Sequence, residues 1–303
     1  MKSISKRDLS MFENVKAFEG SQSSFTFSFA LLPPDERHGM HSLYAFCSYI
    51  DDIVDEIPEN TDEIIAEKQG RLKFWEETID KIYRNKVDSK FINPFVKTIK
   101  RFNIPKQYFM TLITGCRRDL FQTRYVTFDD LKDYCYGVAS IVGLISIEIF
   151  GHKYEETKNY AVNLGYALQI TNIMRDVKAD AERGYIYLPR EDMKRFDYTE
   201  EELLNGIYNE NFAELMRFQA NRAREYYHLA RKSLHPDEKL TIFSAEIMDA
   251  IYFRLLEKIE LNDFDVFKER IRVSQLHKLM IVAKQLLSNK LFIRRLVKNS
   301  EKY

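Results

Sequence analysis

Glycine and proline are scarce along the whole chain, and this scarcity limits what it can fold into. The 303 residues include 10 glycines and 7 prolines, well below the usual shares of about 7% and 5%. Apolar residues recur at helical spacing, whereas the alternation typical of strands is rare. Few chain breakers over such a length favour long helices joined by short loops. We therefore predict an all-α protein.

The periodicity predicts a series of helices that form a single domain. Pro34 and Pro105 suit helix starts, and Gly151 and Gly184 follow helical runs as stop signals. No linker, composition shift or repeat interrupts the chain. We expect one helical domain over residues 20–287, an N-terminal segment 1–19 and a basic tail 288–303. The expected helices span about 7–18, 23–30, 34–56, 61–84, 89–102, 105–123, 127–151, 155–181, 199–206, 208–233, 239–261 and 273–296.

Charge and cysteine content exclude several function classes. Basic and acidic residues balance at 46 each, so the overall charge does not favour nucleic acid as a partner. Cys47, Cys116 and Cys135 lack metal-ligand spacing and are too few for a disulfide framework, which suits a reducing cytoplasm. The first residues carry no apolar run like that of a secretory signal. The most apolar stretch, Val138 to Phe150, is shorter than the roughly 20 residues that span a bilayer, so we expect a buried core helix.

An acidic cluster ends an otherwise apolar predicted helix. Asp51 and Asp55 lie one helical turn apart, after two turns that are almost wholly apolar. Acids at this spacing usually face water, and they repel one another unless a cation lies between them. The cluster alone is compatible with a solvated helix end or with a metal site.

A second polar stripe crosses another apolar predicted helix. Four oxygen-bearing side chains share one face of it: Gln169, Asn172, Asp176 and Asp180. Buried acids without partners are costly, and oxygen ligands without His or Cys suit Mg²⁺, with Mn²⁺ as an alternative. We predict that this stripe faces the first cluster across a cavity. Metal ions held there would bind a diphosphate, neutralise it as a leaving group and so let the allylic C–O bond ionise.

Residues with small side chains occupy one side of the predicted helix between the two acidic motifs. They are Gly137, Ala139, Ser140 and Gly143. Two interpretations stay open, namely close helix packing or room for a long apolar substrate beside the metals.

The end of the chain is basic. From Lys268 to Tyr303 there are ten Lys or Arg residues against two acids, with leucine, isoleucine and valine interleaved. One interpretation is a solvated tail helix packed by one face. The other is peripheral contact with a membrane surface, because basic amphipathic helices are drawn to anionic lipid. We expect a cytoplasmic protein, with the inner membrane face as the place of any such contact.

These motifs, in this order, resemble the squalene/phytoene synthase family over roughly residues 20–285. The likeness is carried by the stretches Ser21–Phe25, Leu31–Pro33, Tyr44–Asp55, Tyr134–Gly143 and Leu164–Pro189. Other stretches look most like bacterial presqualene diphosphate synthases and are shared in large part by bacterial phytoene synthases. The resemblance implies a single-domain isoprenoid-synthase helical bundle around a central cavity.

The resemblance also implies a Mg²⁺-dependent prenyltransferase of carotenoid or hopanoid biosynthesis that condenses two prenyl diphosphates head to head. Farnesyl diphosphate would give presqualene diphosphate or a squalene-type product, and geranylgeranyl diphosphate would give phytoene. Chain length and NADPH use stay open. The implied metal ligands are Asp51, Asp55, Asn172, Asp176 and Asp180. The four aspartates, Tyr134 and Arg175 would be catalytic, and substrate contacts would come from Ser24, Phe25, Tyr44, Val138, Ala139, Gly143, Gln169, Asn172, Tyr187 and Tyr252.

The chain departs from the family pattern near the diphosphate. Ser48 and Tyr185 stand where the family usually has basic residues, and Arg117 and Arg118 precede Asp119 where apolar or acidic residues are common. Losing a guanidinium removes a charge-assisted donor, and either arginine is a candidate to compensate. Two alternatives therefore stay open. One is ionisation without coupling, as in a prenyl-diphosphate phosphatase or terpene cyclase. The other is a catalytically silent prenyl-lipid-binding protein.

Overall fold

The fold is helical throughout the part of the chain that is described. The computed structural model describes residues 28–55, 61–87 and 92–300, with side chains up to residue 288. Within these ranges it contains no strand and one isolated bridge, between Arg124 and Ile186. The all-α prediction is confirmed, whereas the expected helix 7–18 and most of 23–30 lie outside the described residues. The helices are α4 Pro34–Asp55, α5 Asp62–Tyr83, α6 Asn93–Arg101, α7 Lys106–Arg117, α8 Phe128–Cys135, α9 Ile141–Phe150, α10 Glu156–Glu182, α11 Arg190–Arg195, α12 Glu200–Leu204, α13 Glu210–Ser233, α14 Phe243–Leu261 and α15 Gln275–Ser300.

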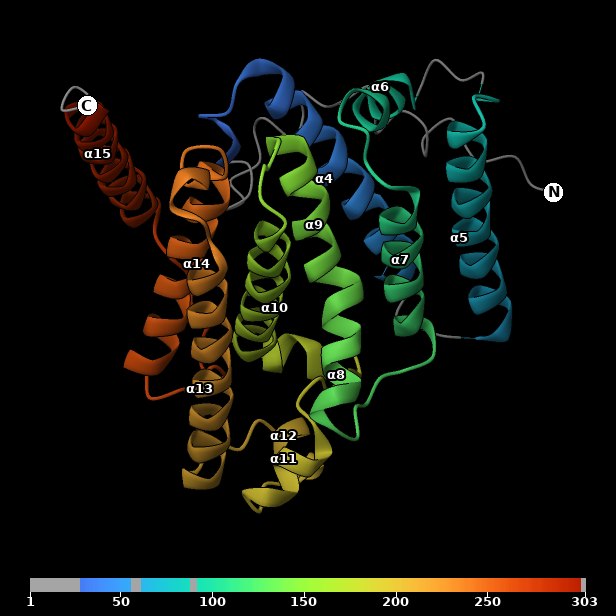
Figure 1. Ribbon diagram of the computed structural model, residues 1–303. Helices are drawn as coiled ribbons and strands as arrows, with labels where there is room; N and C mark the ends of the chain where they lie inside the picture. The colour runs from blue at the N-terminus through green and yellow to red at the C-terminus, as the bar shows by residue number, and fades with distance from the viewer. Residues whose placement is uncertain (1–27, 56–60, 88–91, 301–303) are drawn as a thin grey trace.

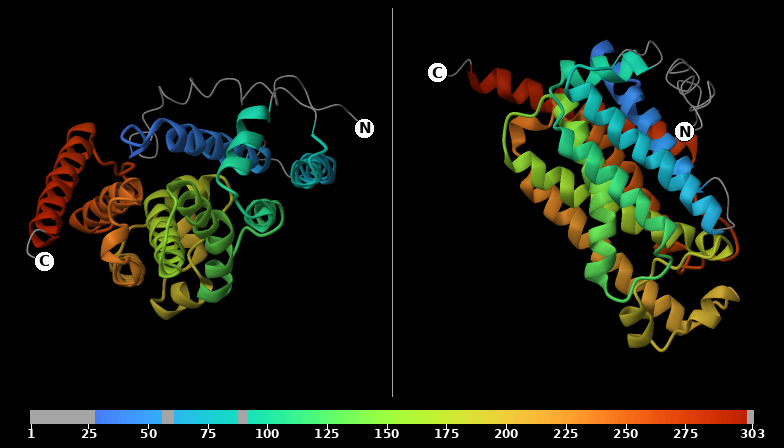
Figure 2. Two further views of the ribbon diagram at one scale, coloured as in Figure 1. Left: turned by 45° about the horizontal axis from the view of Figure 1, so that its top comes forward. Right: turned by 90° about the vertical axis from the view of Figure 1, so that its right-hand side faces the viewer.

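Helix α10 is the centre of the bundle. It packs against α13, α9, α14, α8 and α12 (Figure 1), while α4 packs against α5, α6, α7 and α9. The two helices that carry the acidic motifs therefore belong to different parts of the bundle and are joined through α9. Short α11 and α12 close one end of the molecule, and α15 lies at the outer edge beside α14 in Figure 1 and in the left view of Figure 2.

An aromatic cluster fixes α4 against its neighbours. Phe46 stacks on Phe95 of α6 with ring centroids 4.7 Å apart, and it meets the edges of Trp75 from α5 and Phe109 from α7, each at 5.5 Å. All four side chains are almost completely buried. Aromatic pairs of this geometry add stabilisation beyond their buried area. This packing fixes the position of α4 just before its last turns, which carry Asp51 and Asp55.

The predicted helix 127–151 is a single run interrupted by a π turn. Thr127 caps α8 with the capping box that it forms with Asp130, and Gly151 ends α9 with φ of 76°. Between α8 and α9, residues Tyr136–Ser140 form one π-helical turn. Such bulges are frequent at functional sites. The 3.6-residue periodicity did not reveal it, because a bulge shifts the apolar face without breaking the run.

This same run, Phe128–Phe150, is long and apolar enough to cross a membrane by length and composition alone. Within the protein, 56% of its apolar window is buried. It packs against α10 and α7 in the interior of the bundle (Figure 1). We therefore interpret it as a core helix.

One helix boundary and one short helix differ from prediction. The expected helix 105–123 ends at Arg117, and a 3₁₀ turn, Arg118–Leu120, follows and presents Asp119. The short helix α11 was not predicted, because six residues carry too little periodicity.

A buried carboxyl on α14 gives a pH dependence that is independent of the site. Burial raises the pKa of Glu246 from 4.5 to about 7, with Lys239 opposing the shift and Asp249 adding to it. The folded state keeps this proton where the unfolded chain has lost it, so stability falls as the pH rises from 4.5 to about 7. We expect Glu246→Gln to raise the free energy of unfolding by about 2–3 kcal/mol near pH 8 and to change little near pH 5.

Chemical denaturation at the two pH values checks this prediction. Glu257→Gln, on the same helix with a side chain that is 37% exposed, is the control and should change stability equally little at both. An equal effect of Glu246→Gln at both pH values would contradict the prediction.

Candidate active site

The two acidic motifs face one cavity. A cavity of about 440 Å³ is lined by Asp51 and Asp55 from α4 and by Asp176 and Asp180 from α10. The sequence prediction that these distant rows meet in space is therefore confirmed in geometry. Most other predicted site residues also line this cavity: Tyr44, Tyr134, Val138, Ala139, Gly143, Gln169, Asn172, Arg175 and Tyr187.

Three predicted residues are not among those that line the cavity. Ser24 and Phe25 lie outside the described residues. Tyr252 is buried beside Asn172 and Arg175, with which it forms hydrogen bonds, and it is not on the cavity wall. Tyr252 therefore supports the wall from behind.

The end of α4 is positioned by a buried lysine. Lys68 of α5 donates from Nζ to the carbonyl of Val54 at 2.6 Å, and this side chain is 3% exposed. The interaction satisfies one carbonyl of the last helical turn, where such groups lack a partner within the helix. Ile50, Ile53 and Val54 are buried on the other side. Asp51 and Asp55 line the cavity from this end of the helix.

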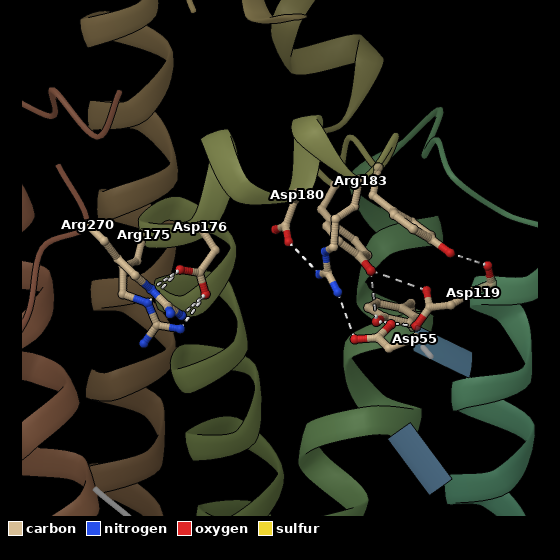
Figure 3. Close-up of polar contacts among 10 residues, drawn as sticks. Asp55, Asp119, Arg175, Asp176, Asp180, Arg183 and Arg270 are labelled. Atoms are coloured by element: carbon tan, nitrogen blue, oxygen red, sulfur yellow. Dashed lines mark hydrogen bonds and ion pairs between the residues drawn. The ribbon is translucent and has the colours of Figure 1, made fainter. Parts of the chain in front are cut away.

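Arg183 bridges the two acidic rows. Its guanidinium donates from Nη1 to Asp55 Oδ2 at 2.7 Å and from Nη2 to Asp180 Oδ1 at 2.9 Å (Figure 3). Asp55 lies on α4 and Asp180 on α10, and the two residues are 125 positions apart in the sequence. This arginine therefore joins two carboxylates across the cavity. The positively charged group between the two rows is therefore the Arg183 guanidinium.

Asp176 is held by two other arginines. Arg175 donates to both carboxylate oxygens of Asp176, and Arg270 donates from Nε to Oδ1 at 2.9 Å and from Nη2 to Oδ2 at 3.1 Å (Figure 3). Burial alone would raise the pKa of Asp176, but the two guanidiniums outweigh it and lower the pKa. Arg270 belongs to the segment between α14 and α15, and that segment is fastened to α10 by Lys178, which donates to the carbonyl of Phe267 at 3.0 Å.

The charge balance of the cavity fits a divalent ion. Burial, with Asp55 and Asp52 nearby, raises the pKa of Asp51 to about 7, and burial raises that of Asp180 to about 6 although Arg183 opposes it. Asp51 stays accessible from the cavity, yet protein atoms surround its carboxyl. Raised pKa values at Asp51 and Asp180 mean that the positive charges nearby do not fully balance these carboxylates.

The ligand set fits as well. Asn172 Oδ1 is buried and has no hydrogen-bond partner among the described residues. Carboxylate and amide oxygens are the ligands that hard divalent cations prefer. Among the described residues no three His, Cys, Asp or Glu side chains lie close enough together to hold an ion as they stand. Binding of a metal would therefore require the carboxylates to exchange their arginine partners for it.

A tyrosine–aspartate network forms the opposite part of the wall. Tyr134 donates from its hydroxyl to Asp119 Oδ2 at 2.9 Å, and Tyr187 donates to Oδ1 at 3.3 Å. Burial raises the pKa of Asp119 to about 7, although both hydrogen bonds oppose the shift. Burial also raises the pKa of Tyr134 well above its usual value, so its hydroxyl keeps its proton at neutral pH. The network therefore fixes the direction of both tyrosine hydroxyls.

The small residues serve both interpretations that the sequence left open. Val138, Ala139 and Gly143 line the cavity. A Cβ at Gly143 would lie 2.8 Å from the carbonyl oxygen of Ala161, so this glycine also allows α9 to approach α10. Gly137 does not line the cavity and instead faces Gly115 of α7 at a distance that leaves no room for a Cβ.

The departures from the family pattern have structural consequences. Ser48 lines the cavity without adding charge. The hydroxyl of Tyr185 donates to the backbone carbonyl of Asp119 at 2.8 Å, so it supports the tyrosine network. Arg117 pairs with Glu76 at 2.9 Å, and neither it nor Arg118 lines the cavity, so the suggested compensation is wrong for this arrangement. Arg175 and Arg183, which line the cavity, supply guanidiniums instead, and Arg270 adds one through its hydrogen bonds to Asp176.

Three residues of the site were missed by sequence reasoning: Asp119, Arg183 and Arg270. Arg183 lies one helical turn after Asp180, so the spacing of opposite charges was a usable signal. Arg270 is 94 residues from Asp176, and no local pattern marks it.

We expect Arg183→Gln to increase the response of the protein to divalent metal. Without Arg183, Asp55 and Asp180 lose the cation between them, which should lower the metal-free melting temperature by about 2–4 °C, as for a loss of about 1 kcal/mol. Added Mg²⁺ would restore the missing charge and stabilise the variant more than the wild type.

Thermal melts with and without Mg²⁺ measure this effect. Arg217→Gln removes an exposed pair with Glu214 and is the control, since it should leave the Mg²⁺ response unchanged. Equal Mg²⁺ responses of wild type and Arg183→Gln would contradict a bridging role.

Comparison with known proteins gives one consistent result. The squalene/phytoene synthase family model matches residues 18–277. A phytoene synthase from Arthrospira platensis is 37% identical over 273 residues, covering 85% of this chain and 86% of that protein. A 15-cis-phytoene synthase from Synechocystis sp. is 34% identical, covering 85% and 78%. Among solved structures, a dehydrosqualene synthase in complex with ligand superimposes with a TM-score of 0.78 at 25% identity, covering 94% of this chain and 98% of that one. A squalene synthase from Alicyclobacillus acidocaldarius superimposes with a TM-score of 0.74 at 24% identity, covering 86% and 97%.

Proposed function

Since the chain belongs to the squalene/phytoene synthase family, whose members join two prenyl diphosphates head to head, we propose that this prenyltransferase uses geranylgeranyl diphosphate and makes phytoene. The observation that supports this choice is the identity of 37% and 34% to proteins named phytoene synthases. The squalene and dehydrosqualene synthases are similar at 24% and 25%. Farnesyl diphosphate is the alternative substrate.

Arg175 and Arg183 line the cavity, and Arg270 is hydrogen-bonded to Asp176 on its wall, so these arginines are suited to hold the leaving diphosphate. Arg175, Arg183 and Arg270 already point at carboxylate oxygens (Figure 3), and guanidiniums bind phosphate oxygens through the same charge-assisted hydrogen bonds. Divalent metal, which this family uses and which we propose to be Mg²⁺, supplies charge that neutralises the leaving group. Asp51, Asp55, Asn172, Asp176 and Asp180 would hold it.

The apolar wall protects the reacting carbons. Val138, Phe150 and Leu168 line the cavity with apolar side chains. They exclude water, which would otherwise capture an allylic cation as an alcohol. The rings of Tyr134 and Tyr187 also line the cavity and stack with centroids 5.3 Å apart, and aromatic faces attract positive charge.

The proposed reaction has two stages. One substrate loses diphosphate, and the double bond of the other captures its allylic carbon. Loss of a proton from the resulting cation then closes the ring of a cyclopropylcarbinyl diphosphate. A second loss of diphosphate, rearrangement and loss of a proton then give phytoene. This balance needs no hydride donor, so we propose that phytoene formation proceeds without NADPH.

A product assay tests the proposal. Purified protein is incubated with Mg²⁺ and either geranylgeranyl or farnesyl diphosphate, with and without NADPH, and the extracted lipids are analysed. We expect phytoene from the first substrate, independent of NADPH. Presqualene diphosphate or squalene from farnesyl diphosphate alone would contradict the proposed chain length, and a prenyl alcohol as the sole product would show ionisation without coupling. A location in the cytoplasm, against the inner membrane face, stays a prediction that cell fractionation tests.

A further inference from the structure

An apolar stripe lies on the solvent side of α15. Five large side chains in the described half of this helix are exposed at spacings of three and four residues: Leu276 (66%), Leu279 (56%), Met280 (49%), Leu286 (46%) and Leu287 (64%). Ala283, also exposed, fills the remaining place on the same face. Residues at this spacing share one side of a helix. We call these six residues the α15 stripe.

The opposite side of α15 makes the contacts with the rest of the protein. The helix packs against α14, where Ile281 and Val282 contact the hydrophobic core and Lys278 is 7% exposed. Figures 1 and 2 place α15 at the outer edge of the bundle. A solvated tail helix would carry polar residues on its outer face, but here that face is apolar. The stripe is therefore an unpartnered surface.

The charge of this region selects the partner. No acidic residue occurs from Arg270 to Ser300, whereas Lys278, Lys284, Lys290, Arg294, Arg295 and Lys298 are basic. Lys284 is exposed beside the stripe. A second copy would bring the same positive charges face to face, which opposes pairing. A surface that combines anionic groups with an apolar interior complements both features.

We propose that the α15 stripe lies on a bilayer surface that contains anionic lipid. The leucines and Met280 enter below the headgroups, and the exposed Lys284 lies among the phosphates. The 26 residues of α15 extend about 39 Å at about 1.5 Å per residue, so the helix lies along the surface. This proposal rests on the α15 surface and not on the reaction, so it succeeds or fails independently of the proposed function.

Vesicle flotation tests the proposal with the full-length protein. Vesicles of phosphatidylcholine alone are compared with vesicles that also contain phosphatidylglycerol. We expect binding to the anionic vesicles that weakens at high salt, and we expect Leu279→Gln/Leu286→Gln to weaken it at least about tenfold, because two leucines leave the apolar contact. Leu204→Gln/Leu240→Gln, which changes two exposed leucines elsewhere, is the matched control and should bind like the wild type.

Several outcomes would overturn the proposal. They are equal binding of the stripe variant and the wild type, equal binding to both kinds of vesicle, or no binding to either. Light scattering distinguishes a further case, since a wild-type dimer that the stripe variant loses would show that a second copy covers the stripe. Turnover of detergent-dispersed substrate should be equal in the stripe variant and the wild type, which separates docking from catalysis.

Discussion

We expect Asp176→Asn to lower turnover of the prenyl diphosphate by at least about 100-fold while the protein stays folded. Asp176 lines the cavity and receives hydrogen bonds from Arg175 and Arg270, so the substitution removes the negative charge that faces the reacting diphosphate. Loss of a partner one layer outside a metal ligand already costs about 10–100-fold, and loss of a ligand should cost at least as much. Initial rates of diphosphate release measure the effect.

The first acidic row should behave in the same way. Asp51→Asn is expected to abolish turnover to a similar extent, because Asp51 lines the same cavity. Asp52→Asn is the matched control, since Asp52 is the adjacent acid and does not line the cavity. Circular dichroism and thermal melts show whether each variant is folded. Normal turnover in Asp51→Asn or Asp176→Asn would remove that residue from the metal site.

The second large effect concerns the contact between α10 and the π turn. A Cβ at Gly165 would lie 2.4 Å from Ser140 Cα and 2.6 Å from Ser140 N, both backbone atoms. Ser140 also donates to the carbonyl of Val162 at 2.8 Å, which ties the turn to α10. We expect Gly165→Ala to lower the free energy of unfolding by about 3 kcal/mol, the upper end of the usual range for overpacking.

The activity of Gly165→Ala should also fall, because the π turn carries Val138 and Ala139 on the cavity wall. Gly70→Ala in α5 is the control. A Cβ at Gly70 meets nothing within 4 Å, so this substitution should stabilise the helix by about 0.5–1 kcal/mol. Urea denaturation of both variants measures the difference. Equal stability of Gly165→Ala and the wild type would contradict the tight contact.

Local patterns explain what the sequence predicted correctly. The acids of each row lie about one helical turn apart, so their shared direction follows from helix geometry alone. The capping box at Thr127 and the left-handed Gly151 are likewise local signals, and both are observed. That the two rows face each other was predicted because isolated buried acids are costly, which makes a shared cation the simplest arrangement.

The features that sequence reasoning missed depend on tertiary contacts. Arg270 reaches Asp176 from a segment after α14, and only the packing of that segment on α10 brings the two together. Asp119 was missed because it is presented by a 3₁₀ turn where a continuous helix was expected. The π turn arises where Gly137 meets Gly115 and Ser140 meets Gly165, and pair contacts of this kind leave no periodic trace.

The expected domain boundary at residue 287 stays a prediction. Helix α15 continues from Gln275 to Ser300 without a break at that position, and the family model ends at residue 277. The stripe and its basic residues therefore lie almost wholly beyond the residues that the family model matches, whereas the solved dehydrosqualene synthase covers 94% of the chain.

Binding of Mn²⁺ in the presence of inorganic diphosphate tests most directly whether both acidic rows act on one metal site. Paramagnetic resonance would compare the wild type, Asp51→Asn, Asp176→Asn and the double variant. A shared site predicts that each single variant loses nearly as much bound Mn²⁺ as the double variant. Independent losses that add up in the double variant, or undiminished binding in either single variant, would contradict it.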